Sequence, residues 1–280
     1  MRTHDLRCLG PHGFHRVAYY EWGDVENPRV VVCVHGLTRN GRDFDALARA
    51  LSADCRVICP DVVGRGLSQW LTHKQDYGYP QYLGDMTALI ARTGAERVSW
   101  VGTSMGGLIG MMLAAQPESP IARLVVNDVG PFIPKASLQR LATYVGKTPR
   151  FDTLDHFEQY LRAVFAPFGP LTDEQWRHLA EHSHRKNDDG TFSTGYDPAI
   201  ANAFPPDPQD VALWPVWDAI RCPTLALRGK ESDLLLRETA EQMTQRGPQA
   251  QLIELDGIGH APMLMSEDQI AVVREFLLAG

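Results

Sequence analysis

The sequence predicts an α/β protein with a mostly parallel central sheet flanked by helices. Strand-like apolar runs alternate with helical patterns in the first half of the chain, and the alternation resumes near its end. Continuous apolar runs such as Val30–Val34 and residues 57–59 are typical of strands that helices cover on both faces. A chain of 280 residues is long enough for one such core with an inserted lobe.

The expected elements follow one another along the chain with short connections. The predicted strands cover residues 15–22, 30–34, 56–59, 97–101, 123–127, 224–228 and 251–255. Helical patterns lie around Leu47, around Met86 and directly after residue 107, and a further helix ends the chain. Ser266 followed by Gln269 predicts a capping box at the start of that last helix.

The alternation stops between residues 131 and 221. This segment has helical patterns instead, with a second capping signature at Thr172 and Gln175. Because the sheet pattern resumes afterwards, we expect a helical cap inserted into one domain. Residues 1–130 and 222–280 would then form the core, and residues 131–221 the cap.

The stretch Gly102-Thr103-Ser104-Met105-Gly106 carries the clearest chemical signal. It joins a predicted strand to a helix rich in small residues. A serine on such a sharp turn projects its hydroxyl from the sheet edge, and the crowded backbone around it requires glycine two residues before and two after. Gly102 and Gly106 meet that requirement, so Ser104 is the predicted nucleophile.

A serine nucleophile needs a histidine base, and the histidine needs a carboxylate partner. His260 follows the strand at 251–255 and is the predicted base. Asp233 follows the preceding strand and is the preferred acid, because it gives the order serine, acid, histidine. Two alternatives remain open. Asp128 ends the strand after the elbow helix, and Glu231 lies in the same loop as Asp233.

Ester hydrolysis also needs backbone N–H groups for the negative charge that develops on the carbonyl oxygen. We expect one from Met105, directly after the nucleophile, and one from Leu37, in the loop after the strand at 30–34. Gly36 lets that loop turn so that the Leu37 amide faces the site.

These segments together resemble the α/β-hydrolase superfamily, in the branch with a helical cap and a single-glycine oxyanion loop. The matching residues are His35-Gly36, residues 61–68, residues 102–106, Ser232-Asp233 and Gly259-His260-Ala261-Pro262. The resemblance implies a Ser104–Asp233–His260 triad with Leu37 and Met105 as the oxyanion hole. Residues 61–68 match a segment usually taken as scaffold. The cap is most similar to those of bacterial carboxylesterases.

The expected activity is hydrolysis of carboxylic esters through an acyl-enzyme, with no cofactor and no metal. A C–C bond hydrolase, a lactonase or acyl transfer could use the same triad, and a ligand receptor on this scaffold is a further alternative. His178 and His182 fit a zinc-protease spacing, but the pattern lacks an evident further ligand and is interpreted as a solvated helix face.

The expected partner is a small-molecule ester. Candidate binding residues are Gly36, Arg39, Phe132, Tyr144 and Trp214. Further aromatic candidates from the expected cap are Phe165, Phe168, Tyr196 and Trp217. A net charge of −7 without charged runs argues against nucleic acid and against a polybasic membrane anchor. Five cysteines without metal-type spacing favour free thiols and the cytoplasm. Monomer and homodimer are both compatible with the sequence.

Overall fold

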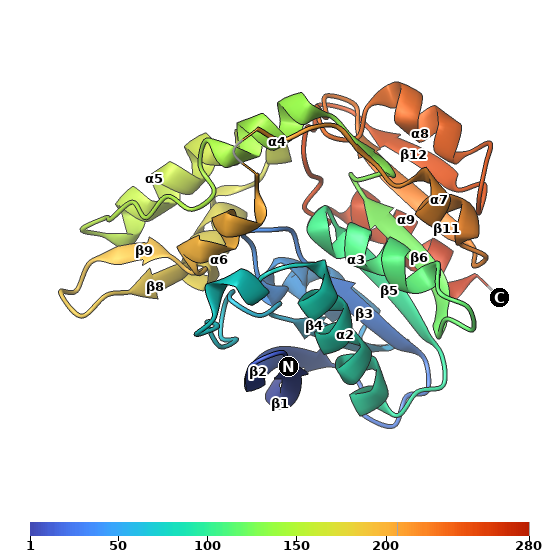
Figure 1. Ribbon diagram of the computed structural model, residues 1–280, viewed down its shortest axis with the longest axis horizontal. Helices are drawn as coiled ribbons and strands as arrows, with labels where there is room; N and C mark the ends of the chain where they lie inside the picture. The colour runs from blue at the N-terminus through green and yellow to red at the C-terminus, as the bar shows by residue number, and fades with distance from the viewer. Residues whose placement is uncertain (206, 280) are drawn as a thin grey trace.

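The computed structural model describes residues 1–205 and 207–279. Within these residues, eight strands form the central sheet in the order β1-β2-β4-β3-β5-β6-β11-β12 (Figure 1). β1 and β2 form an antiparallel hairpin that joins β4 antiparallel, and the remaining pairs are parallel. The strands are β1 Arg2–Gly10, β2 Gly13–Trp22, β3 Val30–Val34, β4 Arg56–Pro60, β5 Val98–Thr103, β6 Ile121–Asn127, β11 Thr224–Gly229 and β12 Gln251–Leu255.

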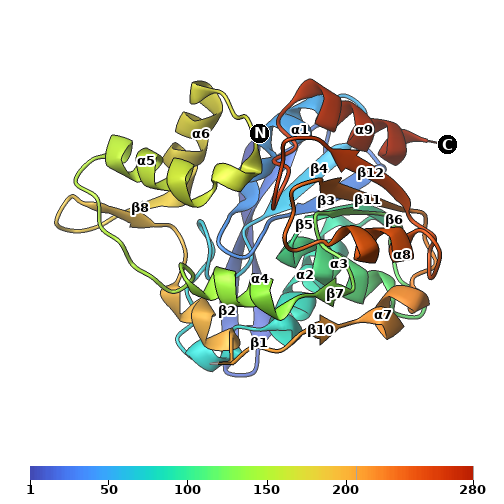
Figure 2. The ribbon, with the colours of Figure 1, turned by 90° about the horizontal axis from the view of Figure 1, so that it is seen from above.

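Helices cover both faces of this sheet. One face carries α1 Asp45–Leu51 and α9 Glu267–Leu278; the other carries α2 Tyr79–Thr93, α3 Met105–Ala114, α7 Trp214–Ala219 and α8 Arg237–Met243 (Figures 1 and 2). Side chains alternate between the two cores along each strand. In β3, Val30, Val32 and Val34 face α2 and α3, while Val31 and Cys33 face α1 and α9. The predicted mostly parallel sheet with helices on both faces is confirmed.

Helix α3 begins in direct contact with the backbone of β3. A Cβ added to Gly106 would lie 2.0 Å from the carbonyl oxygen of Val34, and one added to Gly102 would lie 2.3 Å from the backbone carbonyl carbon of Gly106. Only glycine fits at these two positions. The two glycines therefore set how closely the helix approaches the sheet.

The segment between β6 and β11 contains β7 Phe132–Ile133, α4 Lys135–Ala142, α5 Leu154–Val164, α6 Asp173–Ser183, β8 His184–Lys186, β9 Phe192–Thr194, β10 Val211–Ala212 and α7. In this segment, α5, α6 and β8 lie to one side of the sheet, whereas α7 lies near α8 of the core (Figure 2). Phe157 and Leu161 of α5 form an apolar cluster with Trp176 of α6, joined by Met263 from the sheet side. Trp217 of α7 packs instead in the main core. The division at 131–221 stays a prediction.

One of the two predicted capping boxes is present. The Thr172 hydroxyl accepts from the Gln175 N–H, and the Gln175 side chain accepts from the Thr172 N–H. The second prediction is wrong, because the Gln269 side chain accepts from the Leu264 N–H instead of reaching back to Ser266. No helix among the described residues is both long and apolar enough to span a bilayer.

Candidate active site

Ser104 lies between the end of β5 and the first turn of α3. Its φ of 51° and ψ of −115° place it in the left-handed half of the Ramachandran plot, which non-glycine residues rarely enter. The Ser104 N–H donates to the Asn127 carbonyl at 3.0 Å, which fixes the turn against β6. This is the strained strand-to-helix turn that the glycine spacing predicts.

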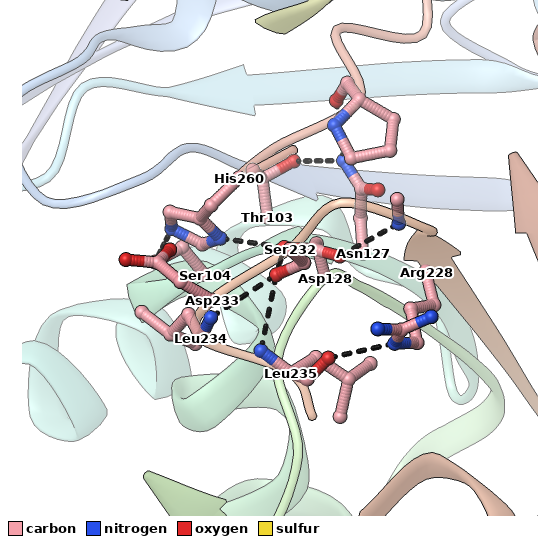
Figure 3. Close-up of polar contacts among 12 residues, drawn as sticks. Thr103, Ser104, Asn127, Asp128, Arg228, Ser232, Asp233, Leu234, Leu235 and His260 are labelled. Atoms are coloured by element: carbon pink, nitrogen blue, oxygen red, sulfur yellow. Dashed lines mark hydrogen bonds and ion pairs between the residues drawn. The ribbon is translucent and has the colours of Figure 1, made fainter. Parts of the chain in front are cut away.

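His260 follows β12 and connects Ser104 to a buried carboxylate. Its Nε2 lies 3.0 Å from the Ser104 Oγ, and its Nδ1 lies 2.8 Å from the Asp128 Oδ2 (Figure 3). The histidine side chain is 9% exposed. A carboxylate at Nδ1 favours the tautomer that carries its proton there, which leaves Nε2 to accept from the serine hydroxyl.

Asp128 directly follows β6 and is fully buried. Its carboxylate accepts from the Gly229 N–H at 2.8 Å and from the Ser232 hydroxyl at 2.5 Å, in addition to its contact with His260. A buried charge is tolerated when its lone pairs are hydrogen-bonded in this way. Both donors come from β11 or the loop after it, because β11 is the neighbour of β6 in the sheet.

The prediction that Asp233 contacts His260 is wrong. The Asp233 carboxylate pairs with Arg140 of α4, and its side chain is 49% exposed. Exposure alternates along this loop, so Ser232 is buried against Asp128 while Glu231 and Asp233 face outward. The structure thus places the first of the two alternatives, Asp128, beside the imidazole.

The loop after β3 lies directly beside Ser104. A Cβ added to Gly36 would lie 3.7 Å from the Ser104 Cβ, and Leu37 lines the same cavity as the serine. Met105 is the first residue of α3, where backbone N–H groups have no acceptor within the helix. The oxyanion role of the Leu37 and Met105 amides stays a prediction.

Arg65 is a residue of this site that the sequence analysis missed. It is fully buried and donates to the carbonyls of Leu37 at 2.8 Å and Val63 at 2.7 Å, while its Nη2 lies 3.6 Å from the sulfur of Met105. It therefore contacts both residues of the expected oxyanion hole. Its place in the matched segment 61–68 was the available signal, but that segment was interpreted as scaffold alone.

A narrow cavity of about 50 Å³ opens onto Ser104 and His260. Three of the candidate binding residues, Gly36, Arg39 and Tyr144, line it. Phe132 and Trp214 do not lie among the described residues that line this cavity, and the prediction for these two is wrong.

Local pairing explains where those two aromatic residues lie. Phe132 belongs to β7, which pairs with β10. The Arg246 guanidinium stacks 4.5 Å from the centre of the Trp214 ring. The further candidates Phe165 and Phe168 do line the cavity, and so does Arg140, which the sequence analysis did not name.

Arg39, which lines this cavity, already forms an ion pair with Asp43. Its Nε and Nη2 donate to both oxygens of Asp43, at 2.8 and 2.6 Å, and its side chain is 6% exposed. The guanidinium also lies 5.1 Å from the centre of the Phe165 ring. Most of its charge is therefore already balanced within the protein.

The two histidines with zinc-protease spacing lie on α6, close to Asp45. By distance, Asp45, His178 and His182 could hold a metal ion. However, the Arg42 guanidinium donates to both oxygens of Asp45, so a metal would compete with a cation already in place. Burial lowers the pKa of His182 to about 4, which keeps this ring neutral near pH 7.

Comparison with known proteins places the chain in a family. Residues 31–275 match the family described as "Alpha/beta hydrolase family". The chain therefore belongs to the α/β-hydrolase family, as its resemblance predicted.

Three individual relatives, all described as hydrolases, are similar to this chain along nearly their whole length. The chain is 47% identical over 280 residues to a 3-hydroxybutyrate-oligomer hydrolase of Cupriavidus necator, covering 97% of this chain and 96% of that protein. A putative hydrolase from Rickettsia typhi superposes with a TM-score of 0.93 at 33% identity over 99% of both chains. An α/β hydrolase from Novosphingobium aromaticivorans gives 0.86 at 38% identity over 98% of both. The prediction of an ester-hydrolysing enzyme is confirmed by these relationships.

Proposed function

We propose that Ser104, His260 and Asp128 hydrolyse carboxylic esters through an acyl-enzyme. The observation that carries this proposal is the hydrogen-bonded chain from the Ser104 hydroxyl through His260 to the buried Asp128. His260 accepts the hydroxyl proton as Ser104 attacks the ester carbonyl, and Asp128 stabilises the imidazolium that forms.

The second half of the reaction uses the same groups. His260 gives its proton to the departing alkoxide, which completes acylation. It then takes a proton from a water molecule that attacks the acyl-enzyme, and it returns that proton to the Ser104 oxygen as the acid product leaves. The Leu37 and Met105 amides stabilise the oxyanion in both steps. Arg65 supports this arrangement by donating to the Leu37 carbonyl and by contacting the sulfur of the Met105 side chain. Substrate, water and these residues supply every atom and proton that the steps require.

We infer that the substrates are short oligomers of hydroxy acids joined by ester bonds. The support is the Cupriavidus necator relative, which matches this chain along nearly its whole length. The aromatic and aliphatic lining of the cavity, including Phe165 and Phe168, suits the short hydrocarbon branches of such acids.

The test compares wild-type protein with Ser104→Ala on the 3-hydroxybutyrate dimer and trimer, with release of acid followed by titration. Loss of the nucleophile should lower kcat by about 10⁶-fold, the scale seen for disabled triads. Ser52→Ala, at the end of α1, is the matched control and should turn over like wild type. Turnover of either oligomer by Ser104→Ala near the wild-type rate would remove Ser104 from the mechanism.

A further inference from the structure

We propose that Arg140 binds the free carboxylate of the substrate, and that Asp233 occupies this position between turnovers. The enzyme would then select esters that carry an acid group at one end. This inference rests on the proposed function, because it concerns how the same site chooses its ester. Its starting point is that Arg140 of α4 lines the cavity that holds Ser104 and His260.

The pairing of Arg140 with Asp233 shows what this guanidinium can bind. Its Nη2 donates to the Asp233 Oδ1 at 2.8 Å, and its Nε donates to the other carboxylate oxygen. This two-pronged arrangement is the usual geometry between arginine and a carboxylate, whether that carboxylate belongs to a side chain or to a ligand. Asp233 therefore marks a position where a substrate carboxylate fits.

The internal pair can be exchanged for a ligand. The Arg140 side chain is 37% exposed and that of Asp233 is 49% exposed, and exposed pairs contribute little to stability. The Ser137 hydroxyl also donates to the Asp233 carbonyl oxygen at 2.6 Å. This contact holds the loop to α4 while the carboxylate side chain turns away into solvent.

The surroundings of Arg140 favour this residue over the other arginine of the cavity. Tyr144, two residues after the end of α4, also lines the cavity. Burial raises the pKa of the Tyr144 hydroxyl, and the charge of Arg140 and a hydrogen bond to it offset part of that effect. The Tyr144 hydroxyl is a second hydrogen-bond donor in the cavity that Arg140 lines, whereas Arg39 is already paired with Asp43.

A fixed cation is needed because the protein as a whole repels anions, with a net charge of −7. An oligomer of hydroxy acids has one free carboxylate, at one end only. Anchoring that end on Arg140 would present to Ser104 the ester bond at a set distance from it. The predicted result is removal of units from the acid end rather than random cleavage.

The experiment compares the dimer of 3-hydroxybutyrate as the free acid with the same dimer as its methyl ester. Wild-type protein should show the higher kcat/KM for the acid, and Arg140→Gln should lower the acid-to-ester ratio about tenfold or more. Arg140→Lys keeps the positive charge but loses the two parallel N–H donors, so it should retain part of the preference for the acid. Lys135→Gln, on the same helix and paired with Asp207, should keep the wild-type ratio.

Asp233→Asn tests the exchange with Arg140 left in place. Without the internal carboxylate, KM for the acid should fall severalfold relative to KM for the methyl ester. A wild-type ratio near one, an unchanged ratio in Arg140→Gln, or a higher KM for the acid in Asp233→Asn would overturn the inference.

Binding to Ser104→Ala protein gives a readout that does not depend on turnover. Calorimetry should show tighter binding of the acid than of the methyl ester, and Arg140→Gln on this background should remove the difference. If wild-type protein hydrolyses both dimers with no such preference, the inference fails while the proposed function stands. If it hydrolyses neither, the proposed function fails, and the binding comparison still decides the role of Arg140.

Discussion

Asp128 and Asp233 follow neighbouring strands of the sheet, yet their carboxylates have opposite surroundings. Asp128 is fully buried and held by the Gly229 amide and the Ser232 hydroxyl, which aim it at His260. Asp233 is half-exposed and turned toward α4. A carboxylate that stabilises an imidazolium must be fixed in position, and only Asp128 meets that condition.

Asp128→Asn should therefore lower kcat on the methyl ester of the dimer by about 10⁴-fold, since the amide favours the wrong histidine tautomer. Asp233→Asn should stay within about tenfold of wild type, because its side chain does not contact the imidazole. Measuring kcat of both variants under steady-state conditions shows which aspartate supports catalysis. A larger loss for Asp233→Asn would show that the acid in solution is not the one placed beside His260 here.

The choice between the two aspartates illustrates what the sequence could not provide. Both positions lie between Ser104 and His260, so chain order is the same for either. The deciding facts are the neighbouring positions of β6 and β11 and the alternation of exposure through residues 231–233. Neither is visible in the spacing of residues. The serine and the histidine, by contrast, follow from the strand that precedes each of them.

At the scale of elements, patterns with a local cause were predicted well. The buried parallel strands follow from apolar runs, and the turn at Ser104 follows from glycine spacing. The Thr172 cap depends on two residues of one helical turn and is present. The Ser266 cap failed because Gln269 has a competing donor, the Leu264 N–H. The prediction that Phe132 and Trp214 line the cavity failed because aromatic side chains of residues 131–221 suit a packed interior as well as a cavity.

The close contact between α3 and β3 can be tested with two glycines in different helices. Gly106→Ala would push a methyl group into the Val34 carbonyl, and overpacking of this kind should cost about 3 kcal/mol or more of unfolding free energy. Gly84→Ala, in the middle of α2 with open space around the new Cβ, should instead stabilise by roughly 1 kcal/mol. Urea unfolding of both variants measures these changes. Equal effects would contradict the tight helix–strand contact.

At the scale of the whole molecule, the segment between β6 and β11 is joined to loops that follow β3 and β4 by polar contacts as well as by apolar packing. Asp197 accepts from the Tyr77 hydroxyl at 2.7 Å and from the Lys74 ammonium. The Asn40 side chain donates to the His182 carbonyl at 2.8 Å. These contacts involve other residues than the Arg140–Asp233 pair, whose two side chains are 37% and 49% exposed.

The dependence of global stability on pH should contain a distinct contribution from His35. This buried ring donates to the Gly36 carbonyl and accepts from the Val62 N–H, and burial lowers its pKa from the usual 6.5 to about 3. Between those values the unfolded chain binds one more proton than the fold. The unfolding free energy should therefore fall as the pH falls, by about 1.4 kcal/mol per pH unit.

Denaturant unfolding between pH 7 and pH 4, with wild type and His35→Gln compared at each pH, isolates this contribution. The comparison is needed because burial raises the pKa of Asp61 to about 6, and this shift acts in the opposite direction in part of the range. The difference between the two proteins should shrink steadily toward acid pH. A constant difference would mean that His35 accepts a proton within the fold.

The side-by-side placement of β6 and β11 has a consequence for how such enzymes diverge. Strands in a sheet are separated by only about 4.8 Å, so the carboxylate that serves the imidazole can be supplied from either strand end without moving the nucleophile. Two lineages could keep one reaction while carrying the charge at different points along the chain. Superposition of their folded sites would identify the equivalent acids, whereas chain order alone would not, since this chain carries an aspartate at both positions.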